Sequence, residues 1–300
     1  MKAAVHKRIT VDLGWGEISA VTWEPAVASD APPVVLLHGG GLDNALLSWE
    51  PLGEALAAAG HRVVAPDHPG FGHSALPPWR VGQERLVTYV GEFLDALGLG
   101  RVVLGGISMG GGMSLGFALE HPGRVAGLLL FGSYGLADRQ TSGPWAGPVQ
   151  WLSWVSVRTG ALGVVTGAYL RNRRLLVSSL RGIVRNPAEL TPELVDAVAA
   201  EAARPDAFVA FGQWQRDQVL PGRLRTSYAA RLAEIRTAVL LVHGERDSGV
   251  PLASVREAAE RLPDARLLVV KDAGHWVQRD RPDLVIPAVT EFLNRASPAR

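Results

Sequence analysis

The chain has 300 residues, which is enough for one large α/β domain that carries an insertion. Hydrophobic residues make up 47% of it and charged residues 20%, a composition that excludes a disordered chain. Lys and Arg (30) balance Asp and Glu (29), so the net charge of +1 gives no general attraction for nucleic acid. Cysteine is absent, which excludes disulfides, thiol nucleophiles and cysteine-based metal sites.

The N-terminal residues do not contain the apolar stretch that is typical of a signal peptide. Apolar runs such as 125–131 are far shorter than the roughly 20 residues that a membrane-spanning helix needs. We therefore expect a cytoplasmic protein without a membrane span or a nucleic-acid partner. A small molecule is the expected substrate, and a homodimer is one assembly that the sequence allows.

Strand-like runs alternate with helical segments along most of the chain. The first two runs, 8–13 and 17–23, are separated by glycines and predict a hairpin. Further strands are expected at 34–37, 61–65, 101–104, 125–131, 238–243 and 266–270, and helices at about 50–59, 83–97, 109–120, 252–262 and 282–294. Because most of these strand runs are apolar throughout, they are typical of parallel strands buried on both faces. The sequence therefore predicts an α/β fold with a mostly parallel, eight-stranded sheet and helices on both faces.

This alternation stops after the run that ends at Phe131. Between 134 and 235 only helical patterns occur, with several tryptophans among them. The expected organisation is therefore a core formed by 1–133 and 236–300, with a helical cap, 134–235, inserted after the sixth strand.

One motif between a predicted strand and a predicted helix indicates nucleophilic catalysis. Gly106-Ile107-Ser108-Met109-Gly110 has the pattern G-x-S-x-G, in which small residues allow a sharp turn that exposes the serine. The turn also places the serine at the start of a helix, where the backbone amide of Met109 can stabilise an oxyanion.

A serine nucleophile needs a base and an acid that orients the base. Asp247 follows the strand 238–243, and His275 follows the strand 266–270, so both are expected at the same sheet edge as Ser108. Asp138, which follows the sixth strand, is the alternative acid.

In combination these motifs resemble the α/β-hydrolase superfamily over essentially the whole chain. The segments that carry the resemblance are His38-Gly39-Gly40-Gly41, Asp67 to Ser74, the G-x-S-x-G motif, Asp247 and His275. The resemblance implies a catalytic triad of Ser108, His275 and Asp247. It also implies an oxyanion hole formed by the backbone amides of Gly40 and Met109.

Four residues are expected to contact the substrate. Gly41 belongs to the glycine loop, Trp276 follows the proposed base, and Trp151 and Trp154 belong to the predicted cap. The helical spacing of the cap tryptophans also fits side chains that only pack the cap on the core. No His, Asp or Glu cluster has the sequence spacing of metal ligands, so we expect neither a metal ion nor a cofactor.

The main functional hypothesis is a serine hydrolase that cleaves a carboxylic ester or lactone of a small, mostly apolar substrate through an acyl-enzyme. The alternative is a C–C bond hydrolase of a vinylogous diketone acid, because the glycine loop, the serine motif and 274–278 are similar to hydrolases of meta-cleavage products. The chain departs from that group in two places: Ile107 stands where asparagine is usual, and Leu42-Asp43 stands where Pro-Gly is usual. A haloperoxidase-like enzyme without a cofactor and a non-hydrolytic small-molecule receptor are further alternatives.

Overall fold

The fold is built on one sheet with eight strands. A computed structural model of the chain describes residues 6–141, 143–161, 163, 167 and 172–296. The described strands are ordered β1-β2-β4-β3-β5-β6-β7-β8 in the sheet. Their bounds are β1 (Lys7–Asp12), β2 (Glu17–Trp23), β3 (Val34–Leu37), β4 (Val63–Pro66), β5 (Val102–Ile107), β6 (Val125–Phe131), β7 (Val239–Gly244) and β8 (Ala265–Val270). Neighbouring strands from β4 to β8 pair in parallel, whereas β2 is antiparallel to both β1 and β4. The predicted hairpin and the predicted mostly parallel sheet are confirmed.

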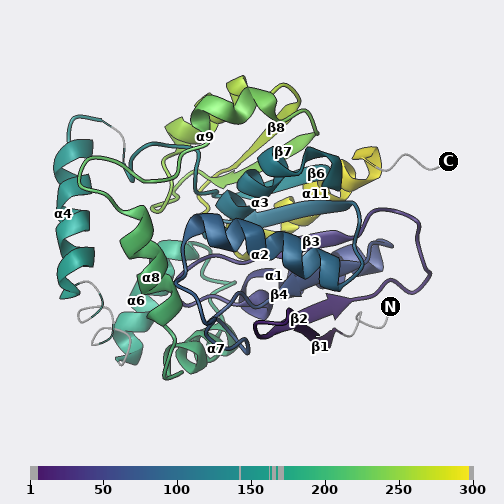
Figure 1. Cartoon of the computed structure of the whole chain (residues 1–300), viewed down its shortest axis with the longest axis horizontal. Helices are drawn as coiled ribbons and strands as arrows, with labels where there is room; N and C mark the ends of the chain where they lie inside the picture. Colours follow the sequence, from purple (N-terminus) through teal and green to yellow (C-terminus); the bar gives the residue numbers. More distant parts are fainter. Residues whose placement is uncertain (1–5, 142, 162, 164–166, 168–171, 297–300) are drawn as a thin grey trace.

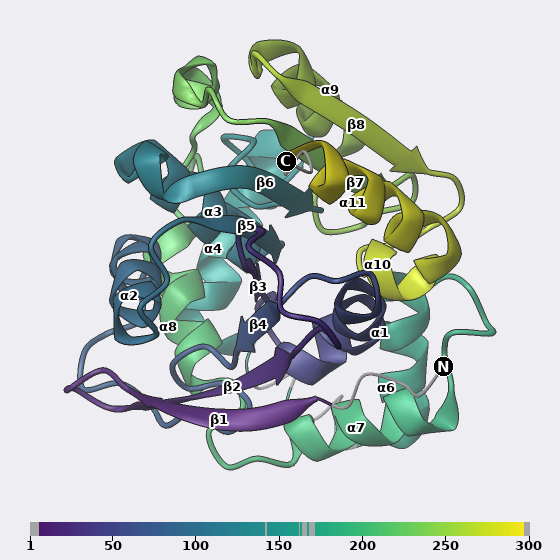
Figure 2. The ribbon, with the colours of Figure 1, turned by 90° about the vertical axis from the view of Figure 1, so that its right-hand side faces the viewer.

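Helices cover both faces of this sheet. α2 (Gln83–Ala96) and α3 (Met109–Glu120) lie on one face, and α1 (Ala45–Ala58) and α11 (Pro282–Ala296) lie on the other (Figure 2). α9 (Leu252–Arg261) contributes to the same apolar cluster as α2 and α3. Successive residues of β3 belong to different clusters: Val34 packs with the α1 side and Val35 with the α2 side. Both faces of each central strand are therefore buried, which explains the continuous apolar runs.

Helices also occupy the stretch between β6 and β7. They are α4 (Ala146–Thr159), α6 (Arg173–Ile183), α7 (Pro192–Ala202) and α8 (Val209–Gln218), and they lie together to the left of the sheet in Figure 1. β6 and β7 are neighbours in the sheet, so the helices between them form an insertion whose two ends join adjacent strands. α7 contacts α1 and α8 contacts α2, so the inserted helices rest on the helices of the core.

Two local features differ from the prediction. α1 begins at Ala45 rather than near residue 50, because the Asn44 side chain accepts a hydrogen bond from the N–H of Leu47 (2.9 Å) and caps the helix. A short helix, α10 (Val277–Asp280), was not expected. None of the described helices is long and apolar enough to cross a bilayer.

Candidate active site

Ser108 lies in a strained turn between β5 and α3. Its φ is 51°, in the left-handed region that residues other than glycine seldom adopt. A Cβ atom on Gly106 would lie 2.3 Å from the carbonyl carbon of Gly110, and a Cβ on Gly110 would lie 2.3 Å from the carbonyl oxygen of Leu37. Backbone therefore fills the space on both sides of the turn, which is the physical reason for glycine two residues before and two residues after Ser108.

Asp247 lies in the loop after β7 and His275 in the loop after β8, and their side chains form a hydrogen-bonded pair. Nδ1 of His275 lies 2.9 Å from each oxygen of Asp247, whose side chain is almost fully buried. Oδ1 of Asp247 also accepts hydrogen bonds from the N–H groups of Gly249 (2.6 Å) and Val250 (3.0 Å). Burial alone would raise the pKa of Asp247, but the hydrogen bond and charge of His275 lower this pKa below its ordinary value. The ionised carboxylate holds the proton on Nδ1, which leaves Nε2 free to act as a base.

Gly132, at the end of β6, connects this pair to the serine turn. The N–H of Ser108 donates a hydrogen bond to the carbonyl oxygen of Phe131 (3.0 Å), and Gly132 is the next residue. A Cβ on Gly132 would lie 2.8 Å from Oδ2 of Asp247 and 3.2 Å from Nδ1 of His275. The pair therefore packs directly on the strand beside Ser108. Gly132 was not among the predicted site residues, although a glycine directly after a buried strand is a signal of such a close contact.

Asp138, the alternative acid, lies elsewhere. Its side chain is exposed, and its carbonyl oxygen accepts a hydrogen bond from the N–H of Leu224 (2.7 Å). The acid that contacts His275 in the structure is Asp247.

Two buried side chains orient the glycine loop that follows β3. Nδ1 of His38 lies 2.7 Å from the carbonyl oxygen of Gly39, and Oδ2 of Asp43 accepts a hydrogen bond from the N–H of Gly39 (2.7 Å). Burial lowers the pKa of His38 to about 3, so its ring is neutral and Nε2 accepts a hydrogen bond from the N–H of His68 (2.9 Å). The Gly39 carbonyl and the Gly40 N–H belong to one rigid peptide plane. Holding the carbonyl therefore fixes the direction of the N–H.

The two predicted oxyanion donors lie at the start of α3 and in the glycine loop. Met109 is the first residue of α3, so its N–H has no partner within the helix. Gly40 lies under α8, because a Cβ on it would be 2.2 Å from Cε2 of Phe211. Only glycine leaves room for this contact between the loop and the inserted helices.

Comparison with known proteins agrees with this arrangement. The family profile of the alpha/beta hydrolase fold matches residues 32–282, most of the chain. The chain belongs to the α/β-hydrolase family. The family predicted from the sequence is thus confirmed, and the protein is a hydrolase.

Relatives of this hydrolase include enzymes named for aromatic ring-fission products. It is 32% identical, over 87% of its length and 88% of the relative, to 2-hydroxy-6-oxo-2,4-heptadienoate hydrolase of Pseudomonas putida. It is 30% identical, over 93% of both chains, to a 2-hydroxy-6-oxononadienedioate/2-hydroxy-6-oxononatrienedioate hydrolase of Pseudomonas putida. A solved meta-cleavage product hydrolase of Pseudomonas fluorescens has the same fold, with a TM-score of 0.76, 24% identity, and 97% and 98% of the two chains covered.

A cavity of about 150 Å³ opens beside Ser108 in the hydrolase. Its lining comes from the serine turn, the segment after β6, α8, the residues after α8 and the loop after β7: Ser108, 133–137, Arg139, Gln140, Phe211, Trp214, Gln215, Gln218, Val219, Leu224 and 249–251. Two of the aromatic side chains, Phe211 and Trp214, stack with their ring centres 5.7 Å apart. They contribute apolar surface from α8 to the cavity and pack against the core cluster that includes α2 and α3.

The four expected substrate-binding residues do not line this cavity. Trp151 is 55% exposed on the outer side of α4, and Trp154 is half-buried. α4 turns its Gln150 inward instead, because the Gln150 amide donates hydrogen bonds to the carbonyl oxygens of residues 220 (2.9 Å) and 223 (3.0 Å). Trp276 is buried beside His275, and Gly41 supplies a left-handed turn (φ 79°). Phe211 and Trp214 of α8 line this cavity instead, and substrate contact by the four expected residues stays a prediction.

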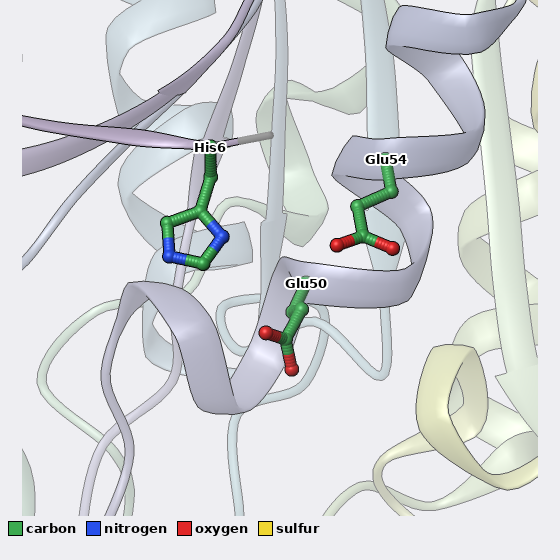
Figure 3. Close-up of side chains that lie close together, drawn as sticks. All are labelled: His6, Glu50 and Glu54. Atoms are coloured by element: carbon green, nitrogen blue, oxygen red, sulfur yellow. The ribbon is translucent and has the colours of Figure 1, made fainter. Parts of the chain in front are cut away.

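The hydrolase fold also brings together three side chains that sequence spacing did not connect. His6, from the segment before β1, faces Glu50 and Glu54 of α1, with one possible ligand atom from each within 4.8 Å of the others (Figure 3). Glu50 also lies 3.9 Å from Nη2 of Arg279, so one of the two carboxylates already has a cationic neighbour. The absence of a metal ion remains a prediction.

Titration of the buried Asp43 carboxyl should make the stability of the protein depend on pH. Burial raises the pKa of this carboxyl from 3.8 to about 7, against the hydrogen bonds that it accepts from Ser48, Gly39 and Asn44. Between these two values the folded state binds more protons than the unfolded state, so the wild type loses stability as the pH rises. Asp43→Asn lacks this titration. We expect the variant to gain stability relative to wild type as the pH rises, with its free energy of unfolding increasing by about 2–3 kcal/mol relative to that of wild type between pH 5 and pH 8.

Urea unfolding at the two pH values measures this difference, and Asp138→Asn, at an exposed site, is the control. A difference between Asp43→Asn and wild type that stays constant with pH would contradict the prediction.

Proposed function

We propose that Ser108, His275 and Asp247 form the catalytic triad of this hydrolase. The observation that carries the proposal is the contact of the His275–Asp247 pair with Gly132, next to the residue that binds the N–H of Ser108. In this mechanism His275 Nε2 takes the proton of the Ser108 hydroxyl as its oxygen attacks a substrate carbonyl. The N–H groups of Gly40 and Met109 then bind the oxyanion.

Residues 134–235 act as a cap in this proposal. Two observations support it: Phe211 of α8 packs on Gly40, and Phe211 and Trp214 line the cavity that also contains Ser108. Apolar side chains above the serine exclude water, which strengthens the electrostatic contacts to the oxyanion.

The comparisons favour cleavage of a C–C bond in a vinylogous diketone acid. This reaction was the alternative to ester hydrolysis in the prediction from the sequence. The relatives that are 30% and 32% identical are named for substrates of this type and match nearly the whole chain. The oxyanion collapses to an acyl-enzyme, the C–C bond breaks, and its electron pair is delocalised into the adjacent unsaturated ketone. His275 gives its proton to this leaving carbon. Water, activated by His275, then releases the acyl group as a carboxylic acid.

Ester or lactone hydrolysis is the second candidate, and two departures in the sequence favour it. Ile107 and Leu42-Asp43 differ from the residues that are usual in C–C hydrolases of ring-fission products. The acyl-enzyme steps are the same for an ester, except that the proton goes to an alcohol oxygen, which needs no stabilisation of a carbanion.

The experiment that tests the proposal compares two substrate sets with wild type and Ser108→Ala. Ring-fission acids with methyl, phenyl and carboxyethyl groups on the ketone are followed by loss of their dienolate absorbance, and 4-nitrophenyl esters by release of nitrophenolate. A higher kcat/KM for a ring-fission acid than for every ester supports C–C hydrolysis. Ester turnover without any turnover of ring-fission acids would replace it with the second candidate.

A further inference from the structure

The outward side of α4 is apolar and exposed. Trp145, Leu152 and Trp151 are 73%, 61% and 55% exposed, and Val149 is exposed as well. Trp145, Val149 and Leu152 are spaced by four and three residues, so their side chains share one face of the helix. A surface helix normally turns its polar side to solvent, whereas α4 buries Gln150 and exposes tryptophan and leucine. We call Trp145, Val149, Trp151 and Leu152 the α4 patch.

The α4 patch lies at the edge of the molecule. α4 is the helix farthest to the left in Figure 1, and its other side contacts α8 and the carbonyl groups of residues 220 and 223. Its exposed apolar area is on the order of 500 Å², because an aromatic side chain offers about 150–250 Å². Apolar patches of this size on single protein molecules are often binding surfaces.

The part of the chain that contains α4 is strongly basic. Residues 139–188 include seven arginines and no aspartate, glutamate or lysine, although the whole chain has a net charge of only +1. Arg158, in the last turn of α4, is exposed, and so are Arg173 and Arg174 at the start of α6. Positive charge is therefore concentrated in the same inserted segment as the α4 patch.

We propose that the α4 patch docks on the surface of a lipid bilayer whose headgroups are negatively charged. Tryptophan and leucine beside arginine is the composition of segments that lie in the bilayer interface. The apolar side chains enter the boundary of the acyl chains, and the arginines bind headgroup phosphates. All four residues of the patch are already exposed, so docking needs no rearrangement of the fold.

Two features favour a lipid surface over a second copy of the chain. A standard protein interface buries about 800 Å² of each partner, which is more than the α4 patch offers. A two-fold contact places the same surface of both copies together, so it would bring two basic segments against each other. Negatively charged headgroups instead attract this segment.

Docking through α4 does not involve Ser108, His275 or Asp247, so the inference goes beyond the proposed function and does not depend on it. It would, however, place the enzyme at a lipid surface through a helix that contacts α8, the helix that supplies Phe211 and Trp214 to the cavity beside Ser108.

Cosedimentation with large vesicles tests the inference. The vesicles contain phosphatidylcholine alone or an equal mixture of phosphatidylcholine and phosphatidylglycerol. The proteins are the wild type, the combined variant Trp145→Gln, Trp151→Gln and Leu152→Gln, the charge variant Arg158→Gln, and Leu284→Gln. Leu284 is an exposed leucine of α11, outside the inserted segment, and serves as the matched control.

We expect the wild type to bind the anionic vesicles at least about 10-fold more tightly than those of phosphatidylcholine, and less tightly when salt is added. The combined variant should lose at least about 10-fold in affinity for the anionic vesicles. Arg158→Gln should lose about 3- to 5-fold, and Leu284→Gln should bind like the wild type.

A site-specific label shows whether α4 itself enters the lipid. Because the chain has no cysteine, Val149→Cys can carry a single environment-sensitive fluorophore, and Leu284→Cys provides the same label on α11. The emission of the label at residue 149 should shift to shorter wavelength when anionic vesicles are added, and that of the label at residue 284 should not shift. This measurement does not require the combined variant to fold.

Three outcomes would overturn the inference. Failure of the wild type to bind anionic vesicles would reject the lipid surface, and equal binding by the wild type and the folded combined variant would reject α4 as the contact. A dimer that sedimentation velocity detects without lipid in the wild type, and that the combined variant does not form, would assign the patch to a second copy of the chain.

Discussion

Replacing Ser108 by alanine is expected to lower kcat by at least about 1,000-fold, because the attacking oxygen is lost. The change removes one hydroxyl group from a turn whose shape is set by Gly106 and Gly110, so the melting temperature should change little. Steady-state kinetics with 4-nitrophenyl hexanoate and a ring-fission acid, together with thermal unfolding, measure both effects. Hydrolysis at the wild-type rate by this variant would exclude Ser108 as the nucleophile.

Variants of the other members of the proposed triad are the controls for this result. His275→Ala should be nearly as inactive as Ser108→Ala, and the double variant should be little worse than either, because the members act as a unit. Asp247→Asn should retain more activity than His275→Ala, and Asp138→Asn should retain nearly all of it, since Asp138 is exposed and Asp247 contacts His275. If Asp138→Asn lost more activity than Asp247→Asn, the assignment of the acid would be reversed.

Replacing Gly132 by alanine is the second change with a large expected effect. The new Cβ would lie 2.8 Å from Oδ2 of Asp247 and 3.2 Å from Nδ1 of His275, so the pair must move to make room. Alanine is also unfavourable at the φ of 44° that Gly132 adopts. We expect kcat/KM to fall about 100-fold and the free energy of unfolding to fall by about 2–4 kcal/mol.

Gly98→Ala separates the two causes of this effect. Gly98 has a φ of 65°, and no atom lies within 4 Å of the position of its added Cβ, so only the backbone cost applies there. This variant should lose about 1 kcal/mol of stability and keep the wild-type kcat. Equal catalytic losses in the two variants would show that contact with the His275–Asp247 pair is not what makes Gly132 necessary.

The core of the protein was predictable from the sequence because its signals are local. Apolar runs such as 125–131 mark strands buried on both faces, and glycine or capping residues mark the ends of helices. The strained turn at Ser108, and with it the candidate nucleophile, could be predicted for the same reason: the glycines that the turn needs are two residues away in the chain, and the contacts of Gly106 and Gly110 explain why. Candidates for the base and the acid followed from their positions after predicted strands.

Contacts between segments far apart in the chain were decided by the tertiary structure. Asp247 rather than Asp138 contacts His275, because the loops after β7 and β8 meet beside the end of β6, where Gly132 leaves room for the pair. No local pattern could show this, since both acids follow strands at the same edge of the sheet.

The orientation of the inserted helices also could not be predicted from local sequence patterns. Their helical pattern was evident from the sequence, but the inward face of α4 was not, because the buried Gln150 is stabilised by carbonyl groups some 70 residues away. That orientation turns Trp151 outward and leaves α8 to supply Phe211 and Trp214 to the cavity. The sequence by itself thus determined the fold and the candidate nucleophile, through interactions between near neighbours in the chain. Which side chains surround the nucleophile depends on hydrogen bonds and packing between distant segments, and only the tertiary structure specifies them.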